Sequence, residues 1–85
     1  MARHIEKARK HLGELHGLAQ ETEAAEQEIL KRAQARLELV SAQIERQRPG
    51  IMAADDDAQS RYLALVQERA QLNLVIARAR SALRL

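Results

Sequence analysis

The chain has one strong helix breaker, and it lies between two long stretches of helical periodicity. Pro49 lacks a backbone donor and Gly50 tolerates a positive φ, so a helix that arrives at this pair should end there. Three residues that favour helix N-caps follow at 55–57, and Asp56 with Gln59 resembles a capping box. The sequence therefore predicts a single all-α domain over 1–85, with a helix at about 4–47, a loop at about 48–55 and a helix at about 56–83.

The composition is typical of long helices rather than of a compact globule. Tyr62 is the one aromatic residue in 85, although aromatic side chains usually supply much of a globular core. Charged residues make up 31% of the chain, and there are only 3 Gly and 1 Pro, too few for the turns of an all-β domain. Cysteine is absent, which excludes disulfides and thiolate zinc sites.

The first predicted helix carries apolar residues in steps of three and four, as a coiled-coil seam does. In its second half these residues are Leu30, Ala33, Leu37, Val40 and Ile44. In its first half they are Ile5, Ala8, Leu12, Leu15 and Ala19. Continuing the first phase would place Glu26 on the seam, whereas the second phase starts four residues later; this offset is a stutter.

The second predicted helix carries two apolar stripes. Its seam, interrupted by Arg69, consists of Ala58, Tyr62, Leu65, Leu72, Ile76, Ala79 and Leu83. Beside it runs a second stripe of Leu63, Val66, Ala70, Leu74 and Ala77. One neighbouring helix cannot cover both stripes. We therefore expect a long antiparallel, coiled-coil-like hairpin that dimerises into a four-helix bundle.

A turn centred near Ile51 sets the expected register of the hairpin. It places Val40 opposite Tyr62 and Leu30 opposite Leu72. The acidic stretch 14–28 then lies opposite the basic end of the second helix, which contains Arg78, Arg80 and Arg84. We interpret this complementarity as setting direction and register, because exposed ion pairs add only ~0–1 kcal/mol each.

The two helices are unequal, so residues 3–17 should project past the hairpin. Their apolar stripe, with Ile5, Leu12 and Leu15, has no partner within the chain, and basic Arg3, Lys7 and Lys10 lie opposite it. Such a segment can bind a second subunit, a groove on another protein or a membrane surface. The sequence leaves open whether it contacts a partner or forms the dimer interface.

Two further features of this segment have ordinary explanations. His4, His11 and His16 lack the spacing of three or four residues that a helical zinc site needs, so we expect no metal. Gly13 and Gly17 each disfavour a helix by ~1 kcal/mol relative to Ala, and we interpret them as a soft point, a bend or a break. A break would make the fold three helices.

Nucleic-acid binding and catalysis have little support in the sequence. The basic residues Lys31, Arg32 and Arg36, like those near the N-terminus, are interrupted by acidic ones, and no aromatic platform accompanies them. The net charge is only +2. No serine lies near a histidine in the sequence, and no glycine-rich phosphate loop is present, so we expect neither an enzyme nor a cofactor.

The function that this pattern favours is a non-enzymatic protein–protein interaction module: a small adaptor, chaperone or inhibitor that docks an apolar helix face on a partner protein. The alternatives are a nucleic-acid-binding accessory factor and a structural coiled-coil scaffold. The N-terminus is charged and lacks the apolar region of a secretory signal, and no apolar run reaches the ~20 residues of a membrane span. A cytoplasmic location is therefore expected.

Overall fold

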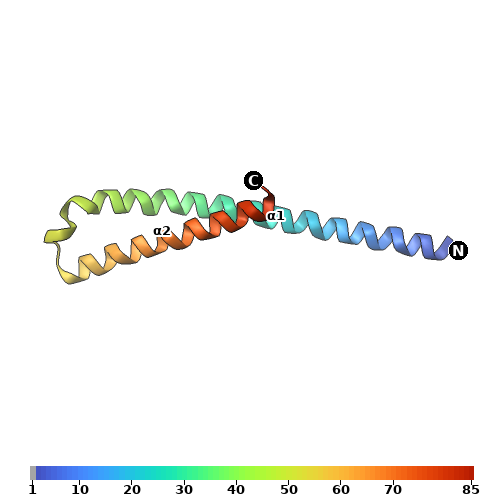
Figure 1. The fold of residues 1–85 in the computed structure, drawn as a ribbon, viewed down its shortest axis with the longest axis horizontal. Helices are drawn as coiled ribbons and strands as arrows, with labels where there is room; N and C mark the ends of the chain where they lie inside the picture. Colours follow the sequence, from blue (N-terminus) through green and yellow to red (C-terminus); the bar gives the residue numbers. More distant parts are fainter. Residues whose placement is uncertain (1) are drawn as a thin grey trace.

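The protein is a long, thin helical hairpin (Figure 1). The computed structural model describes the backbone of residues 2–85 and the side chains from residue 5 onwards. Helix α1 spans Ala2–Gln47, the 3-10 helix η1 spans Arg48–Ala53, and α2 spans Asp56–Leu83. The molecule measures 78 × 19 × 14 Å, so its long axis is about four times its width. The predicted all-α antiparallel hairpin is confirmed.

The turn is more ordered than the predicted loop, because a 3-10 helix that begins at Arg48, with Pro49 in its first turn, replaces irregular chain. Helix α2 is capped by Asp55, whose Oδ1 accepts a hydrogen bond from the backbone N–H of Ala58 at 2.8 Å. The predicted capping box of Asp56 with Gln59 is therefore wrong. The Gln59 amide instead donates to the carbonyl oxygens of Ile51 and Ala54, both at 3.2 Å. These bonds fasten the start of α2 to the turn.

The core is a single row of apolar residues between the helices. Ala33, Val40 and Ile44 of α1 are buried, as are Ile76 and Ala79 of α2, and Val40 and Ile44 are completely shielded from solvent. The half-buried members of the row are Leu30, Leu37, Tyr62, Leu65, Leu72 and Leu83. Two paired helices can shield each other only along one line, which is why few side chains are completely buried.

Helix α1 continues without interruption through Gly13 and Gly17. The two glycines therefore do not break α1, and the fold has no third α-helix in residues 2–85. A Cβ atom at either glycine would meet nothing within 4 Å, so close packing does not explain them. Each still lowers helix propensity by about 1 kcal/mol relative to Ala.

Helix α2 ends in a Schellman motif beside the middle of α1. Arg84 adopts a left-handed conformation with φ 61°. Its N–H donates to the Ser81 carbonyl at 3.1 Å, and the N–H of Leu85 donates to the Arg80 carbonyl at 2.8 Å. Ala82 and Leu83 there lie against Ala19 and Thr22 of α1, so the part of α1 that precedes residue 19 extends past α2 (Figure 1).

Candidate interaction surfaces

The projecting part of α1 presents an uncovered apolar stripe, which we call the N-terminal stripe: Ile5, Ala8, Leu12, Leu15 and Leu18. Ile5 is 57% exposed, Leu12 64% and Leu15 48%. The stripe reaches Ala19, where α2 begins to cover α1, at helical spacing of three and four residues. The N-terminal stripe therefore continues the side of α1 that α2 covers further along.

Sequence reasoning missed one member of this stripe. Leu18 is 58% exposed and follows Leu15 by three residues, so it widens the stripe at its inner end. The heptad pattern includes Ala19 at this point, so Leu18 is not among the residues that the pattern predicts. Lys7 and Lys10 are exposed on the same segment, whereas the side chain of Arg3 lies outside the described part of the chain.

A second uncovered apolar surface lies on α2, along the stripe already recognised in the sequence. Leu63 and Leu74 are each 59% exposed, Val66 is half-buried, and Ala70 and Ala77 are exposed. At 100° per residue this stripe lies about 130° around α2 from the row that faces α1. We call it the α2 stripe. In the described hairpin most of the α2 stripe is exposed to solvent.

One ion pair joins the two helices within the described side chains. Nε of Arg36 lies 2.6 Å from Oε1 of Glu68, and Nη2 lies 3.1 Å from Oε2, so the guanidinium holds the carboxylate with two bonds. The hydrogen bond to Arg36 lowers the pKa of Glu68, and the same bond raises the pKa of Arg36. Sequence reasoning did not find this pair.

At the other end of the hairpin, the expected acidic and basic residues form no close contacts among the described side chains. From residue 5 on, no ion pair joins the acidic stretch 14–28 to Arg78, Arg80 or Arg84; the ion pair formed there, Glu28 with Arg32 at 2.8 Å, is within α1. The arginine side chains end beyond reach of the glutamates in this arrangement. The register is thus held by the apolar row and by Arg36 with Glu68.

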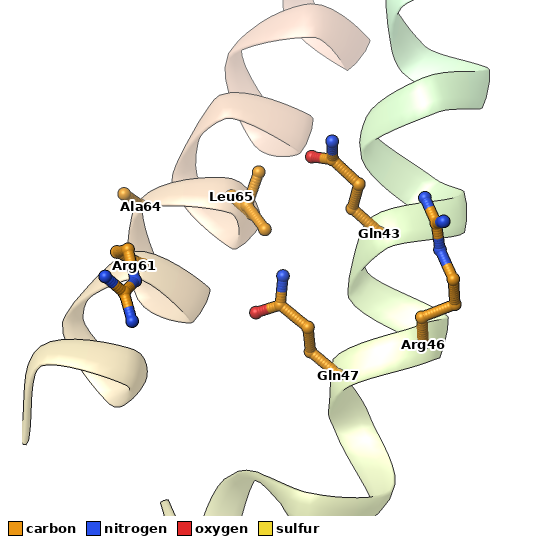
Figure 2. A pocket seen from close by; sticks show the side chains of 6 residues that line it. All are labelled: Gln43, Arg46, Gln47, Arg61, Ala64 and Leu65. Atoms are coloured by element: carbon orange, nitrogen blue, oxygen red, sulfur yellow. The ribbon is translucent and has the colours of Figure 1, made fainter. Parts of the chain in front are cut away.

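A hollow in the surface lies between the helices near the turn (Figure 2). Gln43 and Gln47 of α1 extend toward α2 beside Leu65, while the Arg46 side chain runs along α1. The six lining residues supply amides and guanidiniums but no carboxylate, hydroxyl or imidazole group. The lining therefore contains no side chain of the kinds that usually serve as nucleophile or general base.

A smaller apolar hollow lies at the tip, where Ile51 and Met52 of η1 meet Tyr62 and Leu63 of α2. Met52 is 91% exposed. Arg48 borders this region: the Tyr62 hydroxyl and then Glu45, 3.1 Å away, raise the pKa of Arg48. At the tip, the exposed side chain of Met52, which is of a flexible type, therefore lies near Leu63, the member of the α2 stripe closest to the turn.

The described residues form neither a metal site nor a membrane span. No group of three or more His, Asp or Glu side chains could hold a metal ion, and His11 and His16 are exposed on α1. No helix there has the length and apolar character needed to cross a membrane. The chain matches no protein-family model, and no curated protein or solved structure is significantly similar to it.

Proposed function

We propose that this protein is a non-enzymatic, homodimeric interaction module of the cytoplasm, which inserts the projecting part of α1 into an apolar groove of a partner protein. The observation that carries the proposal is the N-terminal stripe. The side chains of Leu12 and Leu15 are about half exposed or more, because α2 does not extend far enough to cover this part of α1. Water contact with such a row is unfavourable at ~25 cal/mol per Å² of apolar surface.

The spacing of the stripe matches helix-in-groove recognition. Ile5, Ala8 and Leu12 are related as i, i+3 and i+7, which is the anchor pattern of amphipathic helices that bind grooves. Lys7 and Lys10 are exposed on the opposite side of the same segment. An acidic partner surface around the groove would attract these charges at a distance and speed association.

Substitutions on two sides of the same segment test this role. Leu12→Glu with Leu15→Glu places charge on the stripe, and Gly13→Glu with Gly17→Glu adds the same charge on the other side, where a new Cβ meets nothing within 4 Å. With the full chain as bait, we expect proteins cross-linked by wild type to be retained by the glycine variant and lost by the leucine variant. Equal capture by both variants, or equal loss, would overturn the docking role.

A further inference from the structure

The α2 stripe is symmetric about Ala70. Val66 and Leu74 each lie four positions from Ala70, and Leu63 and Ala77 each lie seven positions from it. When two copies of α2 run antiparallel, position n before Ala70 in one copy meets position n after Ala70 in the other. Leu63 then meets Ala77 of the second copy, and Val66 meets Leu74, so large side chains face small or medium ones.

The polar residues on the same face follow the same symmetry. Gln67 and Asn73 each lie three positions from Ala70, which lets their amides face each other across the two copies. Asp56 at the start of α2 and Arg84 just after its end lie fourteen positions before and after Ala70, so an antiparallel pair brings opposite charges to the same end of the assembly. Between these two residues the face has no charged side chain over about a third of the helix circumference at 100° per residue.

The ends of α2 are complementary as a whole. Asp55, Asp56 and Asp57 begin the helix, and Arg78, Arg80 and Arg84 lie in or just after its last turns. An antiparallel partner places the acidic start of one helix beside the basic end of the other, and it also aligns their dipoles favourably. A parallel partner would place aspartates beside aspartates and arginines beside arginines.

We infer that the α2 stripe is the dimer interface, in which a second copy of this chain packs its own α2 antiparallel on the first with a two-fold axis at Ala70. The inference rests on the homodimer of the proposed function and assigns its surface, direction and register. It makes the two α2 helices the central pair and leaves α1 on the outside of each. The N-terminal stripe then remains free on both copies.

Single cysteines test the register, because the chain has no cysteine of its own. Ala70→Cys lies on the axis, so two copies should be joined rapidly by oxidation or by a short bifunctional thiol reagent. Ala77→Cys alone should not be joined, since antiparallel copies place the two positions ~21 Å apart along the axis, far beyond disulfide reach. Mixing Ala77→Cys with Leu63→Cys should restore the link. Ala64→Cys, exposed on another side of α2, controls for chance collisions.

Each outcome decides between this interface and another. Equal linking of Ala70→Cys and Ala77→Cys would show a parallel pair and overturn the inference. A protein that sediments as a dimer but does not link at Ala70 would overturn the register and leave the docking role standing, whereas a monomer at micromolar concentration would overturn the dimer itself. As a second check, Ala70→Glu places two like charges on the axis and should weaken the dimer about 100-fold or more.

Discussion

Arg36 of α1 holds Glu68 of α2 through two hydrogen bonds of 2.6 and 3.1 Å. The pair lies near the middle of the hairpin, on the side of α2 away from the α2 stripe. Both side chains are partly exposed, Arg36 by 48% and Glu68 by 35%. The pair therefore adds little stability, and its main effect is to fix the register between α1 and α2.

The first prediction concerns the pH dependence of this pair. Because Arg36 lowers the pKa of Glu68 in the folded chain, its contribution is fully present above the unfolded pKa of about 4.3 and is lost as pH falls through the folded value. Glu68→Gln should slightly lower the thermal midpoint at pH 7, and the difference from wild type should vanish in strong acid. Glu38→Gln, which replaces an exposed carboxylate on α1, is the matched control. A Glu68→Gln effect of equal size at both pH values would contradict the assignment.

The second prediction tests the apolar row. Ile44 is fully buried, so Ile44→Ala should lower the free energy of unfolding by about 2–5 kcal/mol, through lost transfer energy and the cavity left behind. Leu39 is 60% exposed on the same helix, and Leu39→Ala should change the free energy by less than ~0.5 kcal/mol. Urea titration followed by circular dichroism measures both. Similar losses in the two variants would mean that the row between the helices is misplaced.

The third prediction distinguishes the cap of α2 from its neighbours. Asp55→Ala removes the hydrogen bond to the Ala58 amide and should cost about 0.5–2 kcal/mol of stability. Asp57→Ala removes the same charge from the same helix end but no cap, so it should cost only ~0.3–1 kcal/mol through the helix dipole. The same denaturation experiment compares them. A larger loss at Asp57 would be inconsistent with Asp55 as the cap.

Much of the fold could be predicted because its main determinants are local. Pro49 and Gly50 fixed the end of α1, and the three- and four-residue spacing identified the row that includes Val40, Ile44 and Ile76. The predictions that were wrong depended on the geometry of individual side chains. Three consecutive aspartates are all suitable caps, so composition could not choose Asp55, and the turn gave Gln59 better acceptors than a capping box would.

The glycines and the ion pair show the same limit. Gly13 and Gly17 have low helix propensity. In the described chain no other element packs against α1 at these positions, and the helix continues through both glycines. Arg36 and Glu68 belong to different helices, and they meet only because of the register in which the two helices pack. The N-terminal stripe was predictable because it follows from the unequal lengths of α1 and α2.

The fourth prediction separates the interaction module from a nucleic-acid accessory factor. Arg32 and Arg36 are each paired with a glutamate, Glu28 and Glu68, whose negative charge partly offsets theirs. We expect no measurable binding to duplex DNA or RNA at about 150 mM salt, because phosphate contacts require clustered free cations. Fluorescence anisotropy with labelled duplexes checks this. Submicromolar binding that weakens steeply with salt would favour the accessory factor.

The fifth prediction follows from the separation of the two apolar surfaces. Deleting residues 2–15 removes most of the N-terminal stripe but leaves the row from Leu30 to Ile44 and all of α2. The most direct measurement is sedimentation equilibrium of this truncated chain at micromolar concentration, with helicity recorded on the same sample. If the N-terminal stripe docks a partner and the α2 stripe forms the dimer, the truncated protein will remain helical at twice its chain mass. A truncated protein that runs as a monomer and melts at lower temperature would contradict the account, because it would show that the N-terminal stripe is the dimer interface.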